Sequence, residues 1–314
     1  MLEELATDDG VLLRRDLLAA GLDDRWILRQ RRRGGIVRIR QGAYALTERW
    51  TAAYDARRHL MLVSAVMRQY GDDVAASHVS ACLLDGAPSW GLPLADVHVT
   101  HLDGTIERNG ASVRHHRGDC RVGDIARRNG HWVTAPERTA MDTASIVGRD
   151  PAVAVLDWYL HQGLVTPEGL DHRLRSGMKS WPNSLHLYRV IQLADGRSES
   201  VGETRTRLML HDHGIPEPVL QYVVRGPAGE VAGRVDFAWP ELGVILEFDG
   251  AQKYLALRRP GESVEEAVLR EKAREDLLRE LTGFRVIRIT WADLEHPERT
   301  VERIRRALAL GRVA

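Results

Sequence analysis

The last third of the sequence alternates apolar runs and turn residues in an order that few folds can accommodate. Three apolar runs follow a helix-like stretch, and a second helix, a fourth apolar run and a third helix come after them. The helical stretches span 199–213, 264–281 and 297–309, and the apolar runs span 219–225, 231–239, 242–249 and 284–291. This αβββαβ order predicts a mixed sheet flanked by helices.

Acidic residues stand inside or at the ends of these elements. Glu203 lies in the first helical stretch, Asp236 in the second apolar run, and Glu247 and Asp249 at the end of the third. A carboxylate in a buried strand is costly unless it is paired or binds a cation. Several carboxylates near one point form the oxygen-rich site that Mg²⁺ or Mn²⁺ prefers.

The chain has 314 residues, which is too long for one ordinary core. We expect an α+β and α/β multidomain protein with segments at 1–50, 55–195 and 197–314, the last beginning after the turn at Asp195-Gly196. Two cysteines, an acidic N-terminus without a signal peptide and the lack of a long apolar run predict a cytoplasmic protein with no membrane partner.

The first segment has the pattern of a winged helix-turn-helix. Helical stretches are expected at 2–7, at Leu12–Ala20 and at 24–33, the last with Asp23 as its N-cap. The alternating stretch at 36–46 then predicts a β-hairpin. In this arrangement the third helix enters the major groove and the hairpin contacts the backbone.

Arginine is concentrated in that third helix and hairpin. Lys+Arg and Asp+Glu are equal at 44 each, so net charge indicates no partner. Between residues 25 and 40, however, there are seven arginines and no acid: Arg25, Arg29, Arg31, Arg32, Arg33, Arg38 and Arg40. A charge run is often only a solvated helix face, but an excess without compensating acids predicts contact with double-stranded DNA.

The middle segment gives a weaker signal. Helices are expected at 57–70, 78–85, 136–147, 151–163 and 167–175, and strands at 97–101 and 111–116, which together indicate an α+β segment. Histidines are scattered through it at His78, His98, His101, His115, His116 and His131. Their spacing matches no zinc motif, so we expect ordinary surface or hydrogen-bonded histidines.

The C-terminal order and its acids resemble the PD-(D/E)XK, or restriction-endonuclease-like, core. The closer resemblance is to the Vsr-like mismatch-endonuclease relatives catalogued as domain of unknown function 559. It covers about 199–295 and is carried by Glu247-Phe248-Asp249-Gly250, the helix at Arg274-Glu275-Asp276 and the strand at 283–288.

The resemblance implies a metal-dependent DNA endonuclease or nickase. Asp236 and Glu247 would bind Mg²⁺ or Mn²⁺, Glu203 would add a direct or water-mediated ligand, and Lys253 would orient the water or stabilise the phosphate oxyanion. Arg274 and Asp276 are possible accessory residues. Asp249 is counted with the catalytic residues, because the Vsr-like group has an aspartate near this place and a later basic residue, here Lys253. The usual nuclease pattern has lysine at the position of Asp249, so a non-catalytic nuclease fold is the alternative.

The N-terminal segment and the stretch Thr134–Asp142 resemble AbiEi-type antitoxins of type IV toxin–antitoxin systems. That resemblance implies an autorepressor whose partner is a cognate toxin encoded nearby. Two hypotheses therefore remain: a winged-helix-targeted nuclease for defence or repair, and an antitoxin-like repressor whose nuclease fold is not catalytic.

Overall fold

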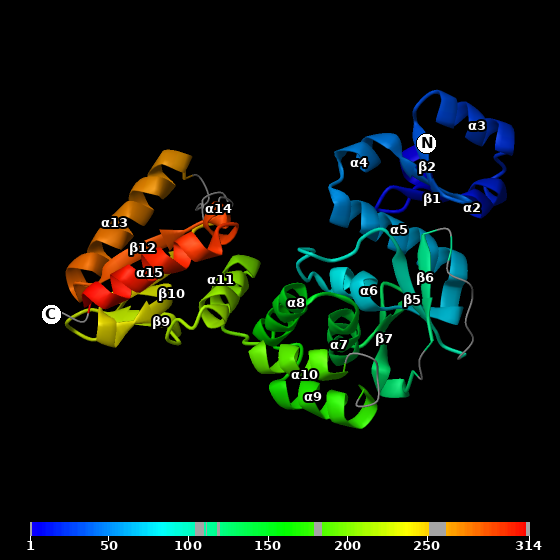
Figure 1. Ribbon diagram of the computed structural model, residues 1–314. Coiled ribbons are helices and arrows are strands. Elements are labelled where there is room, and N and C mark those ends of the chain that lie inside the picture. Colours follow the sequence, from blue (N-terminus) through cyan, green and yellow to red (C-terminus); the bar gives the residue numbers. More distant parts are fainter. Residues whose placement is uncertain are drawn as a thin grey trace. The chain divides into compact units, whose positions relative to one another are not determined.

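The computed structural model describes residues 2–103, 110, 112–117, 120–178, 184–250 and 262–311 (Figure 1). The chain divides into two compact units, 1–192 and 193–314, and each is described by itself. Both mix helices with sheets, so the protein is of the α+β type. No helix among these residues is long and apolar enough to cross a membrane.

The N-terminal part of the first unit is a small helical cluster on a three-stranded antiparallel sheet, with strand order β1-β3-β2. Its elements are α1 (Leu2–Leu5), β1 (Val11–Leu13), α2 (Arg14–Ala19), α3 (Asp24–Arg32), β2 (Ile36–Arg40) and β3 (Ala43–Leu46). Ile27 of α3 packs in a core with Leu12, Leu17, Ile36 and Tyr44. This core fixes which side of α3 faces solvent.

Two predictions for this part are confirmed and one is wrong. Asp23 caps α3 by accepting the backbone N–H of Trp26 at 2.7 Å, and the hairpin forms over β2 and β3. The helix expected from Leu12 begins only at Arg14, because Val11–Leu13 pair with Ala43–Ala45 as a buried strand. Apolar residues at both faces of a strand cannot be told from a helix start by periodicity alone.

The rest of the first unit surrounds a five-stranded sheet with order β6-β5-β4-β8-β7. The strands are β4 (Val74–Ala76), β5 (Val97–His101), β6 (Val113–His116), β7 (Ile125–Arg128) and β8 (His131–Thr134). The helices are α4 (Thr47–Ala52), α5 (Asp55–Tyr70), α6 (His78–Asp85), α7 (Pro136–Ile146), α8 (Arg149–His161), α9 (Pro167–Arg173) and α10 (Ser184–Leu193). β4, β7 and β8 were not predicted; they have three or four residues each, and periodicity alone seldom identifies strands of this length.

Helix α5 contributes to the cores of both sheets. Met61 and Ala65 pack with Val11 and Ala43 of the small sheet. Val63, Val66 and Met67 pack with the strands of the five-stranded sheet. The predicted boundary between residues 50 and 55 stays a prediction, but the two sides of it share this helix.

The second unit is a four-stranded sheet with order β12-β11-β10-β9, covered by helices on both faces. Its elements are α11 (Val201–Asp212), β9 (Val219–Arg225), β10 (Val231–Trp239), β11 (Val244–Phe248), α13 (Val264–Thr282), β12 (Arg285–Ile289), α14 (Trp291–Leu294) and α15 (Pro297–Gly311). β11 and β12 are parallel and the other neighbours are antiparallel. The predicted order of helices and strands is confirmed, with α14 in addition.

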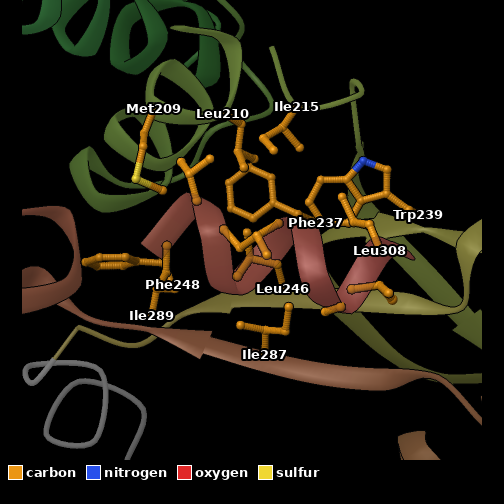
Figure 2. Packing of buried hydrophobic residues seen from close by; sticks show 14 of the residues in the cluster. Met209, Leu210, Ile215, Phe237, Trp239, Leu246, Phe248, Ile287, Ile289 and Leu308 are labelled. Carbon is orange, nitrogen blue, oxygen red and sulfur yellow. The ribbon is translucent and has the colours of Figure 1, made fainter. Parts of the chain in front are cut away.

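The larger core of this unit lies between the sheet and helices α11, α14 and α15. Figure 2 shows part of this core: Trp239 lies near Leu308 of α15, and Ile289 of β12 lies near Phe248 of β11. Gly202 lies at the closest approach of α11 to the sheet: a Cβ there would be 2.0 Å from Cε1 of the buried Phe248 ring. A side chain at this position therefore has no room.

We predict that residues 193–314 fold alone, because this unit has its own sheet and core. Buried Trp239 should give a cooperative fluorescence transition in urea. Aggregation or a broad, non-cooperative transition would mean that the unit depends on the rest of the chain.

In that fragment, Gly202→Ala should lower the free energy of unfolding by about 1–2 kcal/mol, since overpacking outweighs the gain in helix propensity. Gly250→Ala is the control, because its Cβ would meet Phe248 at an ordinary 3.5 Å. Urea unfolding curves measure both. Equal stability of the two variants would show that α11 does not approach β11 as closely as described.

Candidate functional site

Helix α3 presents an exposed group of arginines without acidic partners. Arg25, Arg29, Arg31 and Arg32 lie on the helix, and Arg33 follows it. All five are exposed, and among the described residues none has a carboxylate within ion-pair distance. The single acid of the helix, Asp24, is paired with Arg14 at 2.5 Å. The helix therefore carries a positive charge that no neighbouring side chain neutralises.

The two arginines of strand β2 differ from each other. Arg38 is exposed, and its Nε donates to the backbone oxygen of Arg40 at 3.3 Å. Arg40 is half-buried beside Tyr70 of α5, and burial lowers the pKa of its guanidinium although the hydrogen bond with Tyr70 opposes the shift. Arg38 is thus available to a ligand at the hairpin, whereas Arg40 faces the unit.

In the second unit, Glu203 is held at the start of helix α11. Ser200 is the N-cap, and its hydroxyl accepts the backbone N–H of Glu203 at 3.2 Å and donates to Glu203 Oε1 at 2.8 Å. Glu203 Oε2 accepts the backbone N–H of Glu199 at 2.9 Å and the amide of Gln221 at 2.8 Å. The buried carboxylate is therefore satisfied as part of a helix cap.

Asp236 and Glu247 are neighbours across strands β10 and β11. Phe237 pairs with Leu246, so the same register places Asp236 opposite Glu247. Asp236 Oδ2 accepts the backbone N–H of Phe248 at 2.8 Å. Glu247 is buried, and it is paired with Arg274 of α13 at 2.7 Å and with Arg288 of β12 at 3.7 Å. Arg274 thus lies beside Glu247.

The remaining predicted residues of this site are less closely associated. Asp249 follows β11, half-buried, and its backbone N–H donates to Ile289 O at 2.8 Å. Asp276 has a side chain 63% exposed and pairs with Arg279 at 4.0 Å, so the structure does not bring it to the acids. Lys253 lies outside the described residues. The catalytic and metal-binding roles of this set stay predictions.

Among the described residues, one group of three or more potential metal ligands has all its ligand atoms within 4.8 Å of one another, and it is not the predicted acids. It consists of His78, His98 and His116, which we call the histidine trio. The carboxylates of Glu203, Asp236 and Glu247 do not converge this closely.

The histidine trio lies in the first unit, where helix α6 begins beside strands β5 and β6. His98 Nδ1 and His116 Nε2 are 2.9 Å apart, and the rings of His78 and His116 stack with centroids 3.6 Å apart. Burial lowers the pKa of His98 to about 3, and the His116 imidazole reinforces this shift. Burial lowers the pKa of His116 to about 4, and the Arg114 guanidinium reinforces this shift. Burial also lowers the pKa of His78 well below its ordinary value.

The spacing of these histidines in the sequence did not indicate that they lie together. Strands β5 and β6 are parallel, and Thr100 pairs with His116. Since successive side chains point to opposite faces, His98 and His116 share one face while His101 and His115 share the other. His101 Nε2 and His115 Nδ1 are 2.8 Å apart on that second face. The spacing His-x-x-His in one strand and His-His in the next could have indicated this, but only once the strands were known to pair.

The stretch Thr134–Asp142 forms a buried ion network. Arg138 of α7 pairs with Asp142 at 2.8 Å and with Asp124 at 3.2 Å, and Arg173 of α9 also pairs with Asp124. Arg138 and Asp142 are both buried. Breaking such a pair leaves a buried charge without its partner, so these residues fix α7 and α9 against the sheet edge.

Comparison with known protein families gives a match for the N-terminal part of the chain. Residues 1–47, which contain α1 to β3, match the family described as "Transcriptional regulator, AbiEi antitoxin". The match ends before α5 and the histidine trio, so it concerns the part with the unpaired arginines.

Similarity over nearly the whole chain is found to two proteins of Mycobacterium tuberculosis, "Uncharacterized protein MT2308" of strain CDC 1551 / Oshkosh and "Uncharacterized protein Rv2248" of strain ATCC 25618 / H37Rv. Each is 30% identical over 289 residues, 91% of this chain and 97% of the relative. The crystal structure of the RV2827C protein from Mycobacterium tuberculosis is 19% identical, with a TM-score of 0.38 over 61% of this chain and 74% of that one. The N-terminal residues 1–47 match the AbiEi antitoxin regulator family, and the chain as a whole belongs to the protein family of Rv2248 and MT2308.

Proposed function

We propose that the protein is a transcriptional regulator of the AbiEi antitoxin type that binds double-stranded DNA. The N-terminal part acts as a winged helix-turn-helix in which α3 enters the major groove and the β2–β3 hairpin follows the backbone. The family match over residues 1–47 supports this function. Regulation of an operon that also encodes a cognate toxin follows from the same family description, and the toxin is the second partner that we propose.

The unpaired arginines of α3 are the observation that carries the proposal. Arg25, Arg29 and Arg32 recur at spacings of four and three residues, so they lie along one side of the helix. Several exposed arginines elsewhere in the first unit are paired, for example Arg57 with Asp9 at 2.7 Å and Arg49 with Glu3 at 2.7 Å. A helix whose arginines are unpaired in the folded chain can bind DNA phosphates. Each such contact releases a counterion from the DNA, and this release favours binding.

A metal-dependent nuclease is the second candidate function, and one observation favours it: Asp236 lies opposite Glu247 on adjacent strands. Two carboxylates so placed could hold Mg²⁺ or Mn²⁺ and activate a water for attack on a phosphodiester. Against this, Glu247 is paired with two arginines, Asp236 accepts a backbone N–H and Glu203 caps α11. These contacts give each acid a structural role without a cation, which is why we rank the regulator first.

We predict that Arg29→Ala, Arg32→Ala and Arg38→Ala together weaken binding to duplex DNA and flatten its salt dependence. Each lost phosphate contact lowers the slope of log K against log salt by roughly one, so the triple variant should lose about three units of slope. Fluorescence anisotropy with labelled duplex DNA across a salt series measures both.

The matched control removes three exposed arginines outside this region: Arg175→Ala, Arg189→Ala and Arg279→Ala. It changes net charge equally and should keep the parental slope. If the two triple variants lose the same affinity, binding depends on overall charge and the assignment to α3 and β2 is wrong.

A further prediction concerns the acids of the second unit, and the effect of a divalent cation on them decides between the two candidate functions. Glu247→Gln should lower the free energy of unfolding of residues 193–314 by about 1–3 kcal/mol, because it leaves Arg274 without its buried anionic partner. Asp236→Asn keeps a hydrogen-bond acceptor and should cost less. Under the regulator function, Mn²⁺ or Mg²⁺ neither raises the melting temperature of the parent nor allows it to nick supercoiled plasmid.

Thermal melting and plasmid nicking, each with and without Mn²⁺, measure these effects. The opposite pattern would support the nuclease function: cation-dependent stabilisation and nicking in the parent, both lost in Asp236→Asn, with metal-free stability unchanged or raised because two like charges no longer face each other.

A further inference from the structure

We propose that His78, His98 and His116 form a binding site for one divalent transition-metal ion, with Zn²⁺ as the expected occupant. The site is built from α6, β5 and β6 of the first unit, does not include α3, and is independent of the proposed function.

Geometry is the first argument. The three ligand atoms lie within 4.8 Å of one another. Two imidazole nitrogens on one tetrahedral zinc ion are about 3.3 Å apart, since each Zn–N bond is about 2.0–2.1 Å. His98 Nδ1 and His116 Nε2 are 2.9 Å apart and share a hydrogen bond. An ion would replace this hydrogen bond: the proton would move to the other nitrogen of its ring, and the rings would turn so that both lone pairs face the ion. The fourth position of the tetrahedron would be open to water.

The donor set selects the class of metal. Neutral imidazole suits zinc, copper, nickel and iron, whereas Mg²⁺ and Ca²⁺ prefer oxygen ligands. His78 and His98 are buried and His116 is partly buried, so the three rings form a largely enclosed set of nitrogen ligands. Nearby Arg138 is paired with Asp142 and Asp124, so its positive charge is offset within the unit.

The backbone at His78 supports a built site. This residue has φ of 49°, in the left-handed region that non-glycine residues seldom adopt, and it begins helix α6. Its Nδ1 lies 3.0 Å from the hydroxyl of Ser77. A hydrogen bond to one ring nitrogen orients an imidazole and leaves the other nitrogen for a metal. The unusual φ and this contact together hold the ring of His78 against that of His116.

Binding would join three elements that are distant in sequence. His78 begins α6, His98 is in β5 and His116 is in β6. An ion bound by all three ties the helix N-terminus to two parallel strands at the edge of the sheet, where β6 is the outermost strand. A metal that binds only the folded state should therefore stabilise the first unit.

The test uses the full-length protein, treated with a chelator and titrated with Zn²⁺ by calorimetry and with Co²⁺ by visible absorption. We expect one Zn²⁺ per chain, the absorption of tetrahedral Co²⁺, a higher melting temperature with Zn²⁺ and no effect of Mg²⁺. His98→Gln and His116→Gln should each weaken Zn²⁺ binding at least tenfold, because even loss of a residue that only supports a ligand costs about 10–100-fold.

The matched control is the pair His101→Gln and His115→Gln, which removes two histidines from the opposite face of the same strands. It should leave Zn²⁺ affinity unchanged. If either variant of the trio fails to fold, His78→Gln replaces it, and the stoichiometry and Co²⁺ spectrum of the parent need no variant.

No stoichiometric Zn²⁺ binding by the parent, or no tetrahedral Co²⁺ spectrum, would overturn the proposal. So would equal loss of affinity in the control pair, or Zn²⁺ binding that persists without His98, since either result would place the metal on other histidines. Failure of this test leaves DNA binding by α3 untouched, because Arg29, Arg32 and Arg38 take no part in it.

Discussion

The packing of helix α5 against two sheets at once is the constraint on which the first unit depends. Met61 and Ala65 fill the core beneath the small sheet, while Val63, Val66 and Met67 fill the core of the five-stranded sheet. A close-packed helix cannot shift toward one sheet without opening a cavity at the other. The small sheet that carries α3 is therefore fixed to a larger scaffold, and Arg68 adds an ion pair from α5 to Asp16 of α2. A helix that reads DNA benefits from such support, because phosphate contacts set the register of the whole protein on the duplex and a fixed helix then keeps that register.

Much of the fold could be predicted from the sequence where local signals and tertiary packing agree. Asp23 caps α3 as expected, and the glycines and prolines of the last third separate the elements correctly. The predictions were wrong where pairing with residues distant in the sequence determines the secondary structure. Leu12 and Leu13 form a strand only because Ala43 and Tyr44 lie opposite them, and β4 at Val74–Ala76 is too short to show a period.

The candidate sites also differ in whether local sequence or long-range pairing determines them. Arginines concentrated on one helix can be recognised in sequence because charge without nearby acid is a local property. The histidine trio depends on the parallel pairing of β5 with β6, which brings residues eighteen positions apart together. The acids of the second unit were recognisable as unusual, but their partners were not: the pairing of Glu247 with Arg274 joins residues 27 positions apart. The Ser200-x-x-Glu203 spacing is also a helix-capping signature, a local explanation that the metal-site interpretation passed over.

Direct contact between α3 and DNA is the central claim, and photo-crosslinking tests it most directly. Leu28 is 44% exposed on α3, and Leu185 is 63% exposed on α10 of the same unit. A photoreactive residue placed at either position of the full-length protein reports whether duplex DNA lies against that helix. The account predicts crosslinking from position 28, suppressed by excess unlabelled duplex and by high salt, and none from position 185. Crosslinking from position 185 with none from position 28, while the protein still binds DNA, would contradict it.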